Sequence, residues 1–326
     1  MSSRDEQVRM IDFGALVPAA QRRIEQHVRH TPLEHSDVLS QLTGANIFLK
    51  LENLQVTGSF KARGAFNRLL AMSGDEQARG YVTASSGNHG AAVAYAARQL
   101  GVHGITFVPE GASPLKIDNI RRLGGTVETY GPEGGATEVH ARAYAEQRGM
   151  TYISPYNDSL VIAGQGTIGA ELASRLQAID AIVASVGGGG LISGTAGYLK
   201  TQHPSVQAIG VSPEASMAMA ASVRAGRIIE TEHRPTLSDG TAGGLEPGAI
   251  TFTLCRSLVD QFVEVTEGEI RAALRMFIEG HHMLCEGAAA VALAGTFKKR
   301  EHLRGKTVVV IICGANISAD CLKEAL

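Results

Sequence analysis

The sequence predicts an α/β protein with two lobes, in which mostly parallel, twisted sheets are flanked by helices. Short apolar runs of strand length alternate with amphipathic stretches of helix length, which is the pattern of β-α units. Glycine and serine are concentrated where a strand would pass into a helix. The chain has no internal repeat and no proline-rich linker that would divide it further.

The individual elements follow from the periodicity of the apolar residues. The expected strands are Ile47–Leu51, Tyr81–Ala84, Gly104–Val108, Thr126–Tyr130, Thr151–Ser154, Ala181–Val186, Ala208–Val211 and Thr307–Cys313. The expected helices include Phe60–Met72, His89–Leu100, Pro114–Leu123, Ala136–Arg148, Ile168–Leu176, Gly190–Lys200 and Glu267–Leu284. Ligands bind at the carboxyl ends of strands in such sheets, so the strand-to-helix junctions are the candidate binding loops.

The order of these elements suggests how the chain divides into lobes. We expect a small, mobile lobe over about residues 51–150, and a large lobe formed by residues 1–50 together with residues 151–326.

Composition excludes several classes of protein. The 326 residues are 44% apolar and 19% charged, with a net charge of −2, which gives no general attraction to nucleic acid or an anionic membrane. No apolar run approaches the ~20 residues of a membrane span, and the polar start has no signal-peptide core. The four cysteines form no CxxC pair, which suggests buried thiols in a reducing cytoplasm.

A first candidate site is the segment Thr57–Ala65 (TGSFKARGA), which places Lys61 near the start of a predicted helix. We expect Ser59 to cap this helix. The positive end of the helix dipole should lower the pKa of the Lys61 amine, which would suit a Schiff-base nucleophile. On spacing alone, a solvated surface lysine is the simpler interpretation.

Two other junctions have the character of anion-binding loops. The segment Ala84–Gly90 (ASSGNHG) follows a predicted strand and opens a helix, so its N–H groups could hold a carboxylate or a phosphate, or form an ordinary capped turn. The segment Ser185–Gly194 (SVGGGGLISG) carries four consecutive glycines, which favour close approach of a phosphate to the backbone. It matches neither a dinucleotide fingerprint nor a Walker loop. A fourth segment, Val308–Asn316, ends a buried strand at Cys313, which by itself is typical of a core cysteine.

Together, in this order, the four segments resemble the fold-type II pyridoxal-phosphate enzymes, whose architecture is that of the tryptophan synthase β subunit. Within them, the chain is most similar to the threonine/serine dehydratase and serine racemase family. The resemblance runs from about Thr31 to Asn316. It includes Lys50-Leu51-Glu52-Asn53 with Gln55, Asp239-Gly240 and Glu286.

The resemblance implies a role for each segment. Lys61 would hold pyridoxal 5'-phosphate as a Schiff base, and Asn88 would hydrogen-bond the phenolic oxygen of the cofactor. The other cofactor contacts would come from Phe60, Gly187, Gly188, Gly189, Gly190, Leu191 and Cys313. The substrate carboxylate would be received by Ser85, Gly87, Asn88 and His89. Cys313 would face the pyridine nitrogen as a neutral group, which favours β-elimination over transamination.

The implied activity is the removal of water and ammonia from a small L-3-hydroxy amino acid, threonine or serine by default, with Lys61 as the general base. An amino-acid racemase is an alternative, because a catalytic hydroxyl of Ser86 opposite Lys61 could protonate the second face of the substrate. A bulkier substrate, such as phenylserine or a 3-hydroxy amino acid from hydroxyectoine breakdown, is another. A non-catalytic ligand-binding protein is a third, against which the intact Lys61, Asn88 and tetraglycine argue.

The side-chain pocket of the substrate is the least specified part. We expect residues near Thr31–Glu34, Tyr156-Asn157, Gln165 and Thr241–Gly244 to line it. Relatives that take a second carboxylate have an arginine near the position of Ala136–Thr137. Its absence here disfavours 3-hydroxyaspartate.

The resemblance also bears on cations, domains and partners. Relatives with a divalent cation site have an acid before a proline and another six residues later. Here these positions are Ser212 and Ala218, and Glu214 would need a shifted geometry, so no metal site is expected. The chain ends soon after Asn316, so we expect no regulatory domain. We expect a cytoplasmic homodimer that binds a small amino acid, and neither nucleic acid nor membrane.

Overall fold

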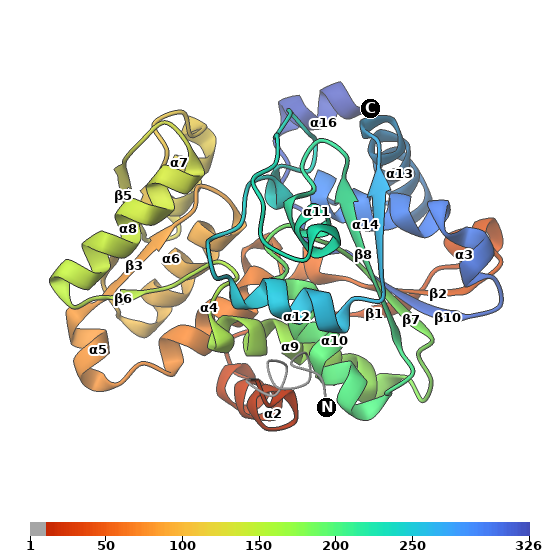
Figure 1. Cartoon of the computed structure of the whole chain (residues 1–326), viewed down its shortest axis with the longest axis horizontal. Helices are drawn as coiled ribbons and strands as arrows, with labels where there is room; N and C mark the ends of the chain where they lie inside the picture. The colour runs from red at the N-terminus through yellow and green to blue at the C-terminus, as the bar shows by residue number, and fades with distance from the viewer. Residues whose placement is uncertain (1–10) are drawn as a thin grey trace.

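The computed structural model describes residues 11–326 and shows two lobes side by side (Figure 1). The large lobe has a six-stranded sheet in the order β1-β2-β10-β7-β8-β9, and the small lobe has a four-stranded sheet in the order β5-β4-β3-β6. The strands pair in parallel except for β1 with β2. The predicted α/β class with mostly parallel sheets is therefore confirmed.

The strands are short, as the apolar runs predict. Those of the large sheet are β1 (Leu33–His35), β2 (Asn46–Lys50), β7 (Ala181–Ser185), β8 (Gln207–Pro213), β9 (Gln261–Val265) and β10 (Thr307–Ile311). Those of the small sheet are β3 (Tyr81–Ala84), β4 (Gly104–Val108), β5 (Thr126–Thr129) and β6 (Thr151–Tyr152). The central strands β7 and β10 are almost wholly buried, because helices cover both faces of the sheet.

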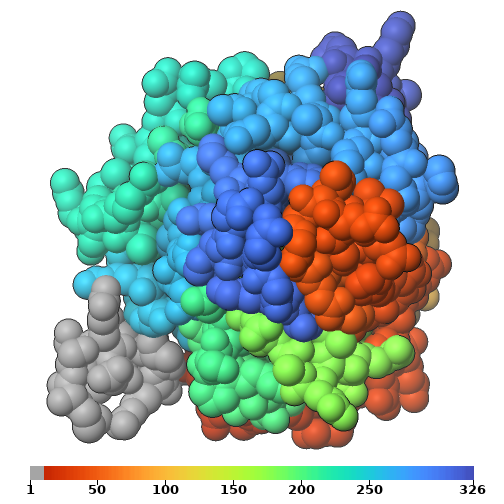
Figure 2. Space-filling model, turned by 90° about the vertical axis from the view of Figure 1, so that its right-hand side faces the viewer, coloured from red at the N-terminus to blue at the C-terminus, as the bar shows by residue number. Residues whose placement is uncertain are grey.

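The helices lie on both sides of each sheet (Figure 1). In chain order, the α-helices are α2 (Phe13–Ile24), α3 (Asp37–Thr43), α4 (Lys61–Leu70), α5 (Gly74–Arg79), α6 (Asn88–Leu100), α7 (Pro114–Arg122), α8 (Gly134–Arg148), α9 (Ser159–Arg175), α10 (Gly190–Gln202), α11 (Ala218–Ala225), α12 (Ile250–Leu258), α13 (Glu267–His281), α14 (Gly287–Lys298), α15 (Arg300–Leu303) and α16 (Ala319–Ala325). The 3-10 turns are η1 (Glu52–Leu54), η2 (Val56–Gly58) and η3 (Asp239–Thr241). Helix α3 packs beside α15 although they are far apart in the sequence, as Figure 2 shows in orange and blue.

The predicted elements are present, most of them within a few residues of their expected bounds, but sequence periodicity missed β1, β9 and several helices. Helix α14 is the clearest case: it is buried on nearly every side, so it has no polar face and no helical period. Helix α9 begins at Ser159, whereas the predicted helix began at Ile168. The prediction missed the first part of α9 because Gly164 and Gly166 interrupt its apolar pattern.

The class of fold does not determine at which residues one lobe ends and the other begins. The four-stranded sheet draws on residues 81–152, because β6 pairs with β3. The predicted boundaries at 51 and 150 and the mobility of the small lobe stay predictions. Residues 1–10 of the predicted large lobe lie outside the described residues. Among residues 11–326, no helix is long and apolar enough to cross a membrane.

Helix α4 packs tightly against α9 of the large lobe. A Cβ atom on Gly164 would lie 2.6 Å from the carbonyl oxygen of Arg63 and 2.6 Å from Cα of Gly64. The two backbones can therefore cross in contact only because neither glycine carries a side chain. Lys61 is the first residue of α4, so this helix crossing fixes the position of Lys61 relative to the large sheet.

A buried network of charges supports the same crossing. The Arg63 guanidinium donates to both carboxylate oxygens of Glu52, each at 2.8 Å, and to Oε1 of Glu171 at 2.6 Å. Lys50 pairs with Glu171 and donates to the carbonyl oxygen of Thr31 at 2.8 Å. The charged side chains are almost completely buried, and each has an opposite charge beside it.

The network yields a stability prediction. Arg63→Met should lower the free energy of unfolding by about 3–5 kcal/mol, because Glu52 and Glu171 stay buried without their main partner. Urea denaturation followed by circular dichroism measures the change. Arg121→Met, which removes an exposed pair with Asp118, is the control and should cost less than about 1 kcal/mol. Equal losses in the two variants would contradict a stabilising role.

Candidate active site

Lys61 is the first residue of α4, as predicted, but the start of the helix differs from the expectation. Ser59 does not cap it: the N-cap position is Phe60, and the Ser59 hydroxyl is buried without a partner among residues 11–326. The reason is that Ser59 has an extended backbone and forms a bridge with Gly314, so the helix begins two residues later. The Lys61 amine donates to the carbonyl oxygen of Pro155 at 2.8 Å and lies 5.2 Å from the centre of the Phe60 ring.

The electrostatic state of Lys61 suits a nucleophile and base. Burial lowers the pKa of the amine to about 8, although nearby Cys313, Glu138 and Glu286 raise it. The direction agrees with the prediction, and the largest cause is the loss of water around the amine.

The loop before α6 offers free donors to an anion. Helix α6 begins at Asn88 with Gly87 as an N-cap that has no side-chain hydrogen bond. Among residues 11–326, the amides of Ser86, Asn88, His89 and Gly90 donate to no other protein group. Because these donors sit at the positive end of a helix, the loop fits the carboxylate predicted for it.

His89 contributes less than the prediction suggests. Its side chain is buried, its Nε2 lies 3.1 Å from the carbonyl oxygen of Ile153, and burial lowers its pKa to about 3. The ring is therefore neutral and carries its proton on Nε2, which leaves Nδ1 without a hydrogen to donate. A carboxylate at this loop would be held by the backbone amide of His89 and not by its ring.

The glycine loop between β7 and α10 has a similar set of unused amides. Gly189 is the N-cap of α10, with a φ of 85° that favours glycine. A Cβ on Gly188 would lie 2.3 Å from the Tyr156 ring, and one on Gly187 would lie 2.9 Å from Cα of Thr241. The amides of residues 187–191 donate to no protein acceptor within residues 11–326. A loop that excludes side chains and leaves its amides free at a helix start fits a phosphate.

The remaining predicted cofactor residue, Cys313, is buried at the end of the central strand β10. Its sulfur accepts from the Ser185 hydroxyl at 3.6 Å, and its carbonyl oxygen accepts from the Phe60 amide at 3.1 Å. Burial raises the pKa of the thiol well above its usual range, so the group is neutral. The structure thus places Cys313 beside the start of α4.

One segment of chain touches every part of this site. Ile153 contacts His89, Pro155 accepts from Lys61, and the Tyr156 ring packs on Gly188. The carboxylate loop, the amine and the glycine loop therefore surround residues 153–156. We call this arrangement the Lys61 site.

Sequence reasoning missed an acidic group near Lys61. Glu138 of α8 influences the Lys61 amine, and burial raises its own pKa to about 7, with Glu246 adding to the effect. Glu246 pairs with Arg142 of α8 and accepts from the Ser154 hydroxyl at 2.9 Å. The signal in the sequence was weak, since Glu138 and Arg142 look like any exposed face of a helix.

Other predicted residues have mixed positions. Ser86 is half-buried, and its hydroxyl has no hydrogen bond to Lys61 or to any other group of residues 11–326. Thr31 and Gln165 do not join the Lys61 site. The Thr31 hydroxyl donates to Glu52 of the buried charge network at 2.5 Å, and the side-chain oxygen of Gln165 accepts from the Gly64 amide of α4 at 3.2 Å.

The structure also shows the surroundings of the three residues on which the expected absence of a cation rests. Ser212 is buried and donates to the carbonyl oxygen of Val186 at 3.1 Å, Ala218 begins α11, and Glu214 is exposed. Within residues 11–326, no three His, Cys, Asp or Glu side chains gather as a metal site. The absence of a metal stays a prediction.

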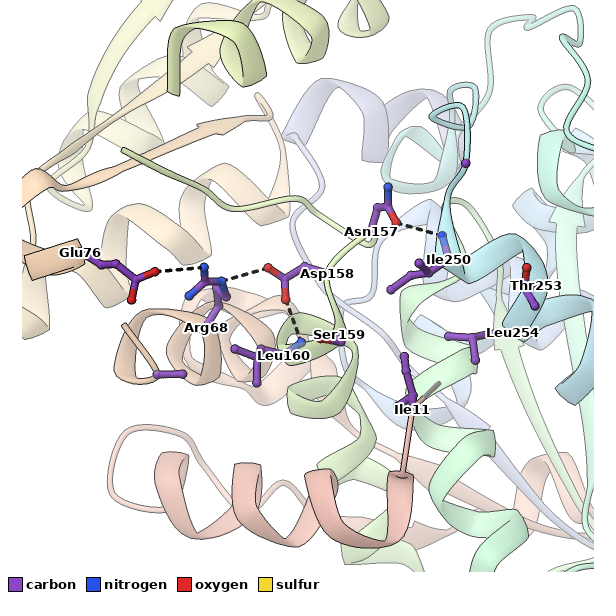
Figure 3. Close-up of a pocket in the computed structure, with 12 residues that line it drawn as sticks. Ile11, Arg68, Glu76, Asn157, Asp158, Ser159, Leu160, Ile250, Thr253 and Leu254 are labelled. Carbon is purple, nitrogen blue, oxygen red and sulfur yellow. Dashed lines mark hydrogen bonds and ion pairs between the residues drawn. The ribbon is translucent and has the colours of Figure 1, made fainter. Parts of the chain in front are cut away.

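A separate cavity of about 730 Å³ lies between the end of α4 and the start of α12 (Figure 3). Its lining includes Arg68, Asp158 and Ile250 but not Lys61. Arg68 donates to Asp158 at 3.0 Å, and the side-chain oxygen of Asn157 accepts from the Ile250 amide at 2.9 Å. Its lining does not include Lys61, and its main polar groups bond to one another, which sets this cavity apart from the Lys61 site.

The lowered pKa of Lys61 yields a prediction for the cofactor expected from the sequence. The rate at which cofactor-free protein captures pyridoxal phosphate should rise about tenfold from pH 7 to pH 9 and then level off, because only the neutral amine attacks an aldehyde. Stopped-flow absorbance measures the rate, with Lys61→Ala as the blank and Lys200→Ala as the control. A rate still climbing at pH 10 would indicate an ordinary lysine.

Comparisons with known proteins agree with this geometry. The family model described as "Pyridoxal-phosphate dependent enzyme" matches residues 24–314. The L-threonine ammonia-lyase of Thermotoga maritima is 42% identical over 310 residues, covering 95% of this chain and 77% of that protein. Processed threonine deaminase isoform 2 of Solanum lycopersicum superposes with a TM-score of 0.90 at 34% identity, covering 100% and 93% of the two chains. Maize serine racemase superposes with a TM-score of 0.89 at 32% identity, covering 97% and 96%. Because the family model and a 42% identical relative both match most of its length, the chain belongs to the pyridoxal-phosphate-dependent enzymes.

Proposed function

We propose that this enzyme removes water and ammonia from a small L-3-hydroxy amino acid, with threonine or serine as the default substrate. The observation that carries the proposal is the Lys61 amine, with a pKa of about 8, held by Pro155 among two loops of free backbone amides. The similarity to a threonine ammonia-lyase and a threonine deaminase supports this choice of substrate.

Each part of the Lys61 site has a task in the proposed reaction. The amides of residues 187–191 hold the phosphate of the cofactor, and those of the loop before α6 hold the substrate carboxylate. Bound pyridoxal phosphate supplies an electron sink for the carbon that loses its proton. The neutral fraction of Lys61 takes that proton from Cα. The bond from Cβ to the hydroxyl breaks as a double bond forms between Cα and Cβ, and the protonated Lys61 returns the proton to the leaving hydroxyl, which departs as water. The enamine product then hydrolyses to a 2-oxo acid and ammonia.

The charge near Lys61 bears on the substrate side chain. Glu138 and Glu246 place two carboxyl groups on the α8 side of the site, with Arg142 as the cation paired to Glu246. A second substrate carboxylate would be repelled there, so we favour threonine or serine over 3-hydroxyaspartate. Among bulkier substrates, the same charge favours one with a cationic end over phenylserine.

A second candidate function, amino-acid racemisation, rests on Ser86. Its half-buried hydroxyl lies in the carboxylate loop with no hydrogen-bond partner among residues 11–326, so it is free to exchange a proton with a substrate. The similarity to maize serine racemase supports keeping this alternative.

The remaining properties are proposals of the same kind. We propose a cytoplasmic homodimer whose partner is its small amino-acid substrate, with no nucleic acid, membrane or divalent cation involved. The net charge of −2 supports the absence of nucleic acid and membrane partners, and the serine and alanine at positions 212 and 218 support the absence of a divalent cation. Closure of the small lobe would exclude water from the Lys61 site.

The proposed base is tested by substitution. Lys61→Ala should lower the rate of 2-oxo acid release from threonine and serine by at least about 100-fold, since it removes the proposed acceptor of the Cα proton. A panel of 3-hydroxy amino acids, assayed for ammonia and 2-oxo acid, identifies the substrate, and Lys200→Ala is the control. An active Lys61→Ala protein would refute the assignment, and D-serine among the products would favour the racemase.

The acidic side of the site yields a specificity prediction. At pH 8.5, above the pKa of about 7, Glu138 is ionised, so Glu138→Gln should raise kcat/KM for 3-hydroxyaspartate relative to serine by about tenfold. Steady-state kinetics with both substrates measure the ratio. Glu133→Gln, exposed at the start of α8, is the matched control. An unchanged ratio would place the substrate side chain away from Glu138.

A further inference from the structure

The side chain of Asn88 is held by a closed ring of hydrogen bonds. Its Nδ2 donates to Oε1 and Oε2 of Glu286 at 2.9 and 3.0 Å, and its Oδ1 accepts from Nδ2 of Asn316 at 2.7 Å. The Asn316 backbone amide donates to Oε2 of Glu286 at 3.1 Å, which closes the ring. Asn88 belongs to the small sheet's helix α6, whereas Glu286 is the N-cap of α14 beside the large sheet.

The ring determines which way round the Asn88 amide sits. Asn316 must present its NH₂ group to Asn88, because the same nitrogen also donates to the carbonyl oxygen of Thr57 at 2.8 Å. Above the pKa of about 7 that burial gives it, the Glu286 carboxyl is ionised and can only accept, so it requires the NH₂ end of Asn88. The two neighbours therefore impose the same orientation on one amide.

This orientation leaves a single free hydrogen on Asn88. The two oxygens of Glu286 lie close together, whereas the two amide hydrogens diverge, so one hydrogen is shared by both oxygens and the other stays free. One lone pair of the amide oxygen is occupied by Asn316, which holds that end of the side chain on the Asn316 side. On its NH₂ side, Asn88 can therefore offer only a hydrogen-bond donor to a further group.

Glu286 also lies near the other parts of the site. It is only 6% exposed, its amide donates to the carbonyl oxygen of Gly314 at 3.0 Å, and the Cys313 sulfur is 3.9 Å from Oε1. Thr57, at the far side of the ring, has a φ of 64° in the turn that leads to Lys61. The ring thus connects the carboxylate loop, the end of β10 and the turn before α4.

We propose that Glu286 and Asn316 are positioning residues that lock the Asn88 amide so that it can only donate to the phenolic oxygen of bound pyridoxal phosphate. This rests on the proposed cofactor site, in which Asn88 faces that oxygen. A fixed donor stabilises the ionised form of the oxygen, whereas a flipped amide would present an acceptor and oppose it. The two residues therefore set the ionisation of the cofactor without touching the substrate.

The test uses the full chain loaded with pyridoxal phosphate and reads the absorbance band and the dissociation constant of the cofactor. Asn316→Asp replaces the donor by acceptors of the same shape, so Asn88 should turn its NH₂ group away from Glu286. We expect the visible band to lose intensity to a near-ultraviolet band, and cofactor affinity to fall about tenfold. Glu286→Gln should cause a smaller change in the same direction, because it keeps one acceptor.

Controls separate this inference from the proposed function. Asn119→Asp and Glu279→Gln, outside the ring, should leave the band and the affinity unchanged. If Asn88→Ala alters both but Asn316→Asp and Glu286→Gln alter neither, the positioning role is wrong. If Lys61→Ala keeps the visible band, the cofactor site itself is wrong. Should Glu286→Gln fail to fold, Asn316→Asp decides, because the Asn316 side chain is exposed.

Discussion

The burial of the Arg63 guanidinium is the constraint on which the rest of this structure depends. A charge without water needs partners in fixed positions, and Arg63 finds them in Glu52 after β2 and Glu171 on α9. Arg63 lies two residues beyond Lys61 on α4. Any shift of α4 relative to the large lobe would break hydrogen bonds that water cannot replace, so the network fixes where the Lys61 amine can reach.

The same logic explains why the site forms where two sheets meet. The glycine loop and Cys313 follow strands of the large sheet, while the carboxylate loop follows β3 of the small one. Residues 153–156 contact both loops and Lys61, so the segment leaving β6 is one physical link between the lobes. Helix starts at both loops leave amides unpaired, and the ligands are expected to complete these hydrogen bonds.

Much of the fold and of the Lys61 site could be predicted from the sequence. The features that could not be predicted depend on contacts between distant parts of the chain. The glycine loop and Lys61 were found because their chemistry is local: consecutive glycines and a lysine at a helix start are visible in the sequence. The Ser59 cap was wrong because a long-range bridge to Gly314 extends its backbone. Asn88 was predicted as a cofactor residue, but its fixation by Glu286 and Asn316 was missed, as was Glu138, since these partners lie far away in the chain and only folding brings them together.

Burial then decides the charges within the site. It lowers the pKa of Lys61 to about 8 and that of His89 to about 3, and it raises the pKa of Cys313 and brings that of Glu286 to about 7. Each group is shifted toward its neutral form, so the site carries less charge than its residues suggest. An incoming phosphate and carboxylate would then be the dominant charges, and neutral amide donors rather than side-chain cations would hold them. The charge of bound anions would raise the pKa of the Lys61 amine, and at a pKa of about 8 the amine is already mostly protonated at pH 7, so the fraction of neutral base grows as the pH rises toward 9.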